Sequence, residues 1–490
     1  MSALAEHLGA LDGAVSVNAD RSVVIHDAAK LRATVGTLAH ASSFGAGEAQ
    51  AAARWLLWVT AQAAGIQPAS IHDLYMARGR GATPNNFTVP AMNLRVLSFD
   101  CARAVFRAAQ PRQVGAMIFE IARSEIGYTD QRPAEYISSI LAAALAEGFT
   151  GPLFIQGDHF QVAAKRYASD PDGELKAVRD LTLEALAAGF LNIDIDTSTL
   201  VDLSQATLGQ QQAVNATLCA QLTHLIRAHE PAGVTVSVGG EIGEVGGKNS
   251  TEAELRAFMA EYRVALDSGG DQADAIPGGT PARNGAEPRR TAPVGLSKIS
   301  IQTGTSHGGV VLPDGTLAQV KVDFDTLEHL SQVAREQYGM AGAVQHGAST
   351  LPPNAFSKFP AAGACEVHLA TNFQNMAFEN MPAELRNEIY AWVEQNKSDQ
   401  RKADETDDQF IYNNRKHAIG PFKRAMWSLP ESVLGPMRAA WEAQFGFLFE
   451  QLNVVNTCDL VAKHVKPVPV PHAPPAGVVA GDGDVSDLAD

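Results

Sequence analysis

The chain has 490 residues, about three average domains, although α/β barrels often exceed the ~150-residue average. Its 38 Lys and Arg against 54 Asp and Glu give a net charge of −16, which argues against nucleic acid as a main partner, because binding phosphates needs clustered positive charge. Apolar residues make up 46%, enough for a large core, and no apolar run approaches the ~20 residues of a membrane span. The four cysteines lie far apart without a CxxC pair. We therefore expect a soluble, cytoplasmic protein of a reducing compartment with no membrane partner.

The Ala-rich residues 1–85 predict an N-terminal helical extension. From residue 88, short β-branched runs alternate with amphipathic helical stretches. The expected strands are 88–94, 115–121, 152–160, 191–197, 234–242, 297–304, 343–349 and 366–371. Strand alternating with helix indicates parallel pairing, and eight such units favour an α/β fold with a closed (β/α)8 TIM barrel. An open doubly wound sheet is the alternative.

These patterns divide the chain into four parts. The barrel is expected to span 86–385, followed by a C-terminal helical segment at 386–465. The Pro-rich and then acidic residues 466–490 predict a disordered tail. The Gly- and Pro-rich stretch 268–292 lies between a helix and the next strand, which predicts an insertion at the barrel face opposite the chemistry.

Metal-ligating residue types gather where the predicted strands end. Asp158 and His159 follow the third strand, Glu241 the fifth, His307 the sixth and His346 the seventh. The carboxyl ends of barrel strands converge on one site, and three imidazoles with a carboxylate suit Zn²⁺ or a similar divalent metal. A single histidine is more often structural than a ligand. The three together, each in a Gly-containing turn, favour a metal site.

These segments resemble the zinc-dependent class II aldolases of the fructose- and tagatose-bisphosphate family. The matching stretches are TVPAMN (88–93), GDH (157–159), GFLNIDIDTS (189–198), EIGEVGG (241–247), GTSHGG (304–309), HGAST (346–350) and EVHLAT (366–371). The likeness runs in order over residues 88–445 and is strongest at the metal turns.

The resemblance implies one Zn²⁺ per chain and names its ligands as His159, Glu241, His307 and His346. It also implies that Asp158 is the acid/base carboxylate, which exchanges a proton with the hydroxyl at the bond being cleaved. The alternative for Asp158 is a residue that only orients His159.

Substrate contacts follow from the resemblance as well. The positions that match the family's phosphate-binding turns are Gly308, Gly347, Ser349 and Thr371. Asn93 matches an asparagine near the substrate, and Arg415 matches an arginine that family members insert into a neighbouring subunit's site. Plain turn geometry and an ordinary surface arginine are the alternatives. A homodimer or homotetramer is expected.

The sequence departs from the family in its eighth strand and in one loop. His368 stands where the family has an Asn that contacts the ketone half, and Ala370 stands where it has an Asp that contacts the aldehyde half. The loop base after the fifth strand is also missing, with Glu244, Glu252 or Glu254 as candidate replacements. We keep His368 as a candidate substrate contact.

The resulting hypothesis is a metal-dependent lyase of carbohydrate metabolism and glycolysis. It would cleave a sugar phosphate, with fructose 1,6-bisphosphate as an expected substrate, to dihydroxyacetone phosphate and an aldehyde. The alternatives are a non-catalytic companion subunit of a tagatose-bisphosphate-type aldolase and another metal-assisted reaction on the same barrel.

Overall fold

The structure is a computed structural model that describes residues 2–243, 248–268, 293–305, 312 and 321–474. Eight parallel strands close into a barrel, because β6 pairs with β5 on one side and with β7 on the other. The barrel strands are β4 (Val89–Asn93), β5 (Ile118–Ala122), β6 (Gly151–Gln161), β7 (Asn192–Asp196), β8 (Ser237–Glu241), β9 (Lys298–Ile301), β10 (Ala343–Gln345) and β11 (Glu366–Leu369). All eight expected strands are present, and the (β/α)8 barrel is confirmed.

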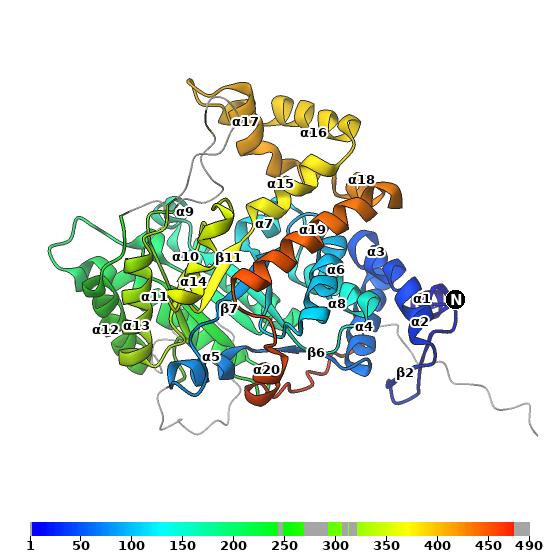
Figure 1. The fold of residues 1–490 in the computed structure, drawn as a ribbon, viewed down its shortest axis with the longest axis horizontal. Coiled ribbons are helices and arrows are strands. Elements are labelled where there is room, and N and C mark those ends of the chain that lie inside the picture. The colour runs from blue at the N-terminus through cyan, green and yellow to red at the C-terminus, as the bar shows by residue number, and fades with distance from the viewer. Residues whose placement is uncertain (1, 244–247, 269–292, 306–311, 313–320, 475–490) are drawn as a thin grey trace, which may run out of the picture.

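Helices separate the strands and cover the barrel (Figure 1). They are α6 (Ser98–Ala109), α7 (Arg123–Tyr128), α8 (Pro133–Glu147), α9 (Ala164–Ser169), α10 (Pro171–Ala188), α11 (Leu208–His229), α12 (Glu252–Ser268), α13 (Phe324–Tyr338), α14 (Lys358–Ala361) and α15 (Thr371–Asn380). Several barrel strands are buried at every position, as expected for a parallel sheet enclosed by helices. Among the described residues, no helix is long and apolar enough to cross a membrane.

The N-terminal part is helical, but it also contains strands that the sequence did not predict. Its helices are α1 (Ala3–Ala10), α2 (Ala28–Thr34), α3 (Gly36–Phe44), α4 (Gly47–Ala63) and α5 (His72–Gly79). Strands β1 (Val15–Val17) and β2 (Val23–Ile25) form a hairpin-like antiparallel pair. Strand β3 (Ile66–Ala69) pairs with the first residues of the long strand β6 and so adds an edge to the barrel sheet. Its Pro68 is tolerated because edge strands accept proline.

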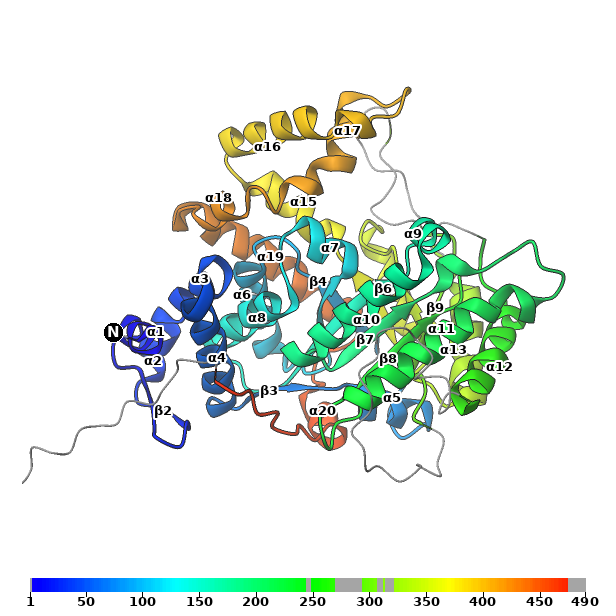
Figure 2. The ribbon, with the colours of Figure 1, turned by 180° about the vertical axis from the view of Figure 1, so that it is seen from behind.

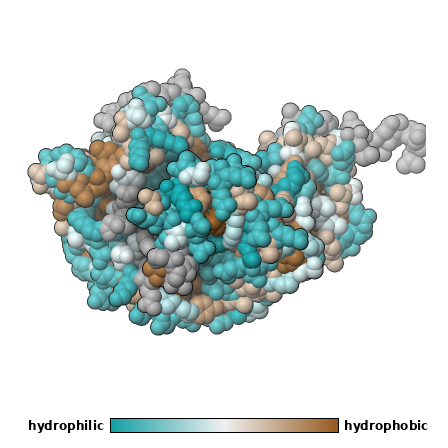
Figure 3. All heavy atoms as spheres, turned by 90° about the horizontal axis from the view of Figure 1, so that it is seen from above, coloured by the Kyte–Doolittle hydropathy of each residue, from teal (hydrophilic) through white to brown (hydrophobic). Residues whose placement is uncertain are grey.

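The C-terminal part of the chain forms helices outside the barrel. They are α16 (Ala383–Asn396), α17 (Asp407–Asn414), α18 (Lys423–Trp427), α19 (Glu431–Gln451) and α20 (Cys458–His464). Helices α16 and α17 project from the side where α7, α9 and α15 follow the carboxyl ends of their strands (Figures 1 and 2). The face seen from that side is predominantly hydrophilic (Figure 3). This C-terminal segment therefore stands beside the end of the barrel where the sequence predicts the chemistry.

The first part of the predicted disordered tail is ordered against the N-terminal helices. The indole of Trp58 donates to the Val470 carbonyl at 3.0 Å, and that of Trp55 donates to the His472 carbonyl at 3.2 Å. The rings of Trp58 and His472 are stacked, with their centroids 3.7 Å apart. An extended Pro-rich segment leaves its carbonyls unpaired, so they can accept from indoles that α4 presents. Residues 475–490 lie outside the described residues, and so does the predicted insertion at 268–292 except for Ser268, which ends α12.

A buried cluster of charges lies inside the barrel. The ammonium of Lys298, on β9, donates to Gln156 Oε1 at 2.7 Å and to Asp194 Oδ2 at 2.9 Å, and it forms an ion pair with Glu366. The hydroxyl of Tyr75 donates to the same Glu366 carboxylate. Lys298 therefore joins β6, β7, β9 and β11 through one buried cation.

We predict that Lys298→Met destabilises the protein by about 3–5 kcal/mol, because it leaves the buried carboxylates of Asp194 and Glu366 without their cation. Lys176→Met is the matched control: its ion pair with Asp180 is exposed, and such pairs contribute only ~0–1 kcal/mol. Urea denaturation of both variants measures the difference. Equal stability losses in the two would contradict the role of Lys298.

Candidate active site

A β-bulge in β6 sets the geometry of the site. Gly157 pairs with Ile193 of β7, but the next pair joins Phe160 to Ile195, so Asp158 and His159 together stand opposite one residue of β7. His159 has a φ of 41°, a left-handed conformation that is unusual for a residue other than glycine. Side chains of a regular strand alternate between its two faces, whereas a bulge can re-aim them. Here both Asp158 and His159 line the same cavity.

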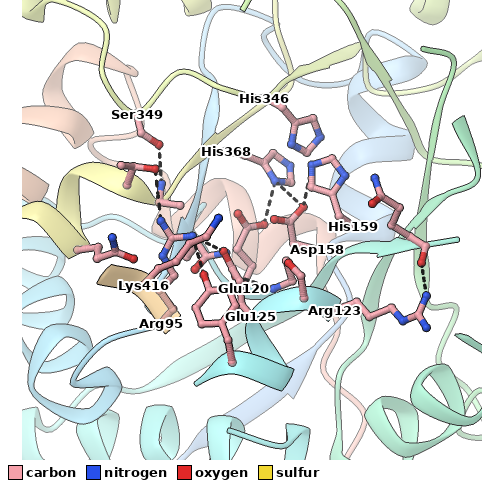
Figure 4. A pocket seen from close by; sticks show the side chains of 18 of the residues that line it. Arg95, Glu120, Arg123, Glu125, Asp158, His159, His346, Ser349, His368 and Lys416 are labelled. Atoms are coloured by element: carbon pink, nitrogen blue, oxygen red, sulfur yellow. Dashed lines mark hydrogen bonds and ion pairs between the residues drawn. The ribbon is translucent and has the colours of Figure 1, made fainter. Parts of the chain in front are cut away.

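The cavity has a volume of about 630 Å³ and lies at the carboxyl ends of the barrel strands. Three imidazoles gather in it: the ring centroid of His346 is 4.1 Å from that of His159 and 4.0 Å from that of His368 (Figure 4). Glu241, at the end of β8, brings its Oε2 within 3.3 Å of His159 Nδ1. Three of the four predicted metal ligands therefore meet, while His307 lies outside the described residues.

Carboxylates surround these imidazoles. Asp196 Oδ2 lies 3.0 Å from His159 Nδ1, and Asp158 Oδ1 lies 3.2 Å from His368 Nδ1. The Glu120 carboxylate is 3.0 Å from the same His368 nitrogen. Although burial opposes a charged ring, the carboxylates of Asp158 and Glu241 raise the pKa of His159 well above its ordinary value, and those of Glu120 and Asp158 do the same for His368.

Two of the buried acids, Glu120 and Glu241, are shifted in the direction that disfavours their charge, whereas the pKa of Asp196 is lowered despite its burial, by its hydrogen bond with His159. Burial, reinforced by the Asp158 carboxylate, raises the pKa of Glu120 to about 8. Burial, reinforced by Asp196, raises the pKa of Glu241 to about 7. Perturbed acids and bases that line one cavity are typical of a functional site.

This donor set fits a divalent cation. Ligand atoms of Asp158, His159 and His346 all lie within 4.8 Å of one another, and so do those of His159, Asp196 and Glu241. Imidazole nitrogens and carboxylate oxygens are the donors that zinc and similar metals take. The excess of buried carboxylates would also be relieved by a cation. His159 belongs to both groups, so the described residues around it that could hold a cation are Asp158, His159, Asp196, Glu241 and His346.

Five of the predicted substrate contacts line the cavity. Among the lining residues are Asn93, Gly347, Ser349, His368 and Thr371. Gly347 has a φ of 69°, which a glycine adopts without strain. The hydroxyl of Ser349 accepts from the backbone N–H of Ala370 at 2.7 Å, so it ties the turn after β10 to the start of α15. Gly308 lies outside the described residues.

Arg415 lies away from the cavity. Its guanidinium donates to Asn375 Oδ1 at 2.8 Å and to the Tyr390 hydroxyl at 3.3 Å, and it covers the rings of Phe378 and Tyr412. It is only 8% exposed. These contacts fix the C-terminal segment to α15, and the neighbouring Lys416 lines the cavity instead.

The two described candidates for the missing loop base, Glu252 and Glu254, do not line the cavity either. Glu252 pairs with Arg256 and His329, and Glu254 pairs with Lys248. Glu244 lies outside the described residues.

Sequence reasoning missed several cavity residues. Arg95, Glu120, Glu125 and Lys416 line it, but no motif marked them as site residues. Glu120 and Arg95 had a recoverable signal: Glu120 is an acid inside the otherwise apolar strand β5, and Arg95 is a charged residue two positions beyond the end of β4. Lys416 belongs to the same short stretch, 413–416, that resembles the family's Asp-Pro-Arg-Lys segment, but which of its residues lines the cavity depends on how the C-terminal segment folds back.

A family model described as fructose-bisphosphate aldolase class-II matches residues 79–425. The chain belongs to this family. A comparison with curated proteins finds no match. The class II aldolase match therefore extends from the end of α5 to α18, and it includes every described residue of the site.

The chain is also similar to several solved structures at low sequence identity. The fructuronate-tagaturonate epimerase of Cohnella laeviribosi is 11% identical, with a TM-score of 0.51 and 90% of each chain covered. The fructose-bisphosphate aldolase of Campylobacter jejuni is 17% identical, with a TM-score of 0.43, over 79% of this chain and 94% of that one. A structure titled as a probable tagatose 6 phosphate kinase from Sinorhizobium meliloti is 14% identical, with a TM-score of 0.49, over 77% and 98%.

We predict that the wild-type protein carries one divalent metal per chain, which the replacement of a ligand removes. His159→Ala and His346→Ala should each strip the metal without unfolding the barrel, because both side chains sit at strand ends rather than among the packed helices. Metal analysis by mass spectrometry, together with circular dichroism, tests this. His329→Ala, whose imidazole is exposed and pairs with Glu252, is the control and should keep the metal. Full metal content in both ligand variants would contradict the assignment.

Proposed function

We propose that this protein is a metal-dependent carbon–carbon lyase that reversibly cleaves a ketose phosphate to dihydroxyacetone phosphate, or a similar ketone, and an aldehyde. The observation that carries the proposal is the bulge in β6, because it turns a carboxylate, Asp158, and an imidazole, His159, into the cavity that His346 also lines. Zinc, bound by His159, Glu241, His346 and His307, is the proposed cofactor. Fructose 1,6-bisphosphate is an expected substrate.

A divalent cation in this site supplies a positive charge that polarises a ketone carbonyl and stabilises the negative charge that develops on its oxygen. Asp158 would take the proton from the hydroxyl group whose carbon becomes the aldehyde, and it would return that proton in the reverse reaction. Its carboxylate is held 3.2 Å from His368 Nδ1 and 3.9 Å from His159 Nε2. These two imidazoles orient the carboxylate toward the cavity.

Substrate orientation would come from the turns around the cavity. Asn93 is fixed by a hydrogen bond from its amide to Glu125, and Ser349 is fixed by the Ala370 N–H. Because these groups are held before substrate arrives, little ordering is needed on binding. The proposed partner is therefore a small sugar phosphate.

A second candidate function is epimerisation of a ketose or keto sugar acid. The carbon that inverts would be the end of the broken bond that becomes the aldehyde. If the aldehyde rotates in the cavity so that the bond forms again on its opposite face, the same proton transfers invert one hydroxyl-bearing carbon. Two observations favour this candidate. The likeness to the epimerase covers 90% of both chains, and the family's Asn and Asp in the eighth strand are here His368 and Ala370.

We predict that Asp158→Ala keeps the metal but lowers kcat by about 10²–10⁴-fold, the usual contribution of a positioned acid/base. The change in KM should be smaller than the change in kcat, because the carboxylate acts on the transition state and not on substrate binding. Asp202→Ala, an exposed carboxylate outside the cavity, is the control. An unchanged kcat with weaker metal binding would mean that Asp158 only orients His159.

Product analysis separates the two functions. We predict that the metal-loaded protein releases free dihydroxyacetone phosphate from a ketose phosphate, and that a tail other than that of fructose 1,6-bisphosphate gives the highest kcat/KM, because Ala370 offers no acceptor to a tail hydroxyl. NMR spectroscopy of the reaction, with the same mixture run on fructuronate, identifies each product. An epimer without free ketone and aldehyde supports the second candidate. A kcat/KM for fructose 1,6-bisphosphate above every alternative contradicts the altered specificity.

A further inference from the structure

Two cations meet at one end of the cavity, and nothing above assigns them a role. Arg95 follows β4, and Lys416 lies in the single turn that follows α17. Both line the cavity beside Thr371 and Ser349, on the opposite side of the imidazole cluster from Arg123 (Figure 4). They come from opposite ends of the chain.

Arg95 is rigidly held. Its Nη1 pairs with Glu125 Oε1 at 2.5 Å and donates to the Tyr128 hydroxyl at 3.2 Å, and its Nη2 donates to Thr371 Oγ1 at 3.3 Å. The side chain is only 10% exposed. The Nε of Arg95 is buried without a hydrogen-bond partner in the described part of the chain. The guanidinium is therefore placed by protein contacts but not fully satisfied by them.

Lys416 differs because, among the described residues, no carboxylate pairs with it directly. The Glu125 carboxylate acts on it only at longer range, in the direction that raises its pKa. Its ammonium donates no hydrogen bond and forms no ion pair within the described residues, and its nearest recorded contact is the Tyr128 ring, 6.0 Å from Nζ to the centroid. Burial and the Arg95 guanidinium lower the pKa of Lys416. A half-buried ammonium next to a guanidinium is unfavourable unless an anion joins them.

The segment that carries Lys416 is anchored on both sides of the cavity. The N–H of Gly420 donates to the Tyr128 carbonyl at 3.1 Å, on the α7 side. On the α15 side, the Asn375 amide donates to the Tyr412 hydroxyl at 3.0 Å, and Arg415 donates to Asn375. The position of Lys416 is thus set by contacts within the same chain.

We infer that Arg95 and Lys416 recognise the terminal anionic group of the substrate, and that Lys416 is the specificity residue that distinguishes a charged ketone from a neutral one. This inference rests on the proposed function. The anion would bind between the two cations, next to the Thr371 hydroxyl and the first turn of α15, whose N–H groups also favour negative charge. Charge-assisted hydrogen bonds of this kind are stronger than neutral ones.

Calorimetric titration of the metal-loaded protein tests the inference with three ketones. Dihydroxyacetone phosphate carries a phosphate, 5-hydroxy-4-oxopentanoate carries a carboxylate at a similar distance from the ketone, and dihydroxyacetone carries no charge. Lys416→Ala should weaken at least one of the charged ligands by about 10-fold or more, as expected for a hydrogen bond to a charged group, and leave dihydroxyacetone unchanged. The charged ligand that loses affinity identifies the anion as a phosphate or a carboxylate.

Lys402→Ala is the matched control, because this lysine is exposed and precedes α17 in the same segment. It should leave all three affinities unchanged. Lys416→Arg, which keeps the charge, should recover part of the lost affinity. Equal weakening of the charged and neutral ketones, or no weakening of either charged ketone, would overturn the inference. Binding is measured without turnover, so a protein that binds the anion through Lys416 but cleaves no ketose phosphate refutes only the lyase proposal.

Discussion

The site depends on one irregularity in the β6–β7 ladder. A regular parallel strand would send Asp158 and His159 to opposite faces, one toward the cavity and one toward the helices. The extra residue between Gly157 and Phe160, together with the left-handed backbone of His159, places both side chains in the cavity. Such a conformation is strained, and it persists only where the surroundings hold it. Here the ion pair of His159 with Asp196 and the buried ring of Phe160 hold it.

Beneath the imidazoles, the barrel interior is polar where most cores are apolar. Buried carboxylates on β5, β7 and β11 are compensated by Lys298 and by His368, and Gln156 donates to both Glu120 and Glu366 at 2.9 Å. Such a network is stable only when its groups are paired, since a lone buried charge is costly. It therefore fixes the orientation of His368 and, through it, of Asp158. The stability of the barrel and the geometry of the site depend on the same contacts.

The C-terminal segment contributes to the site of its own chain. Helices α16 and α17 project on the side of the barrel that bears the chemistry, and the turn after α17 brings Lys416 into the cavity. Arg415, the arginine that the family resemblance singles out, instead holds this segment against α15. Of these two adjacent residues, Arg415 anchors the segment and Lys416 lines the cavity. The direction of each side chain follows from how the segment packs and not from its motif.

The sequence by itself determined the eight strands, their parallel arrangement and the residues at the strand ends. These features depend on local periodicity and on short motifs, which single segments of chain encode. Asp158, His159, Glu241 and His346 could be located for that reason. The tertiary structure alone decided what depends on distant segments: the pairing of β3 with β6, the contact of the 466–474 segment with α4, and the approach of Lys416 to Arg95. Residues that meet across about 320 positions of sequence leave no local pattern, because their contact is set by the packing of the whole chain.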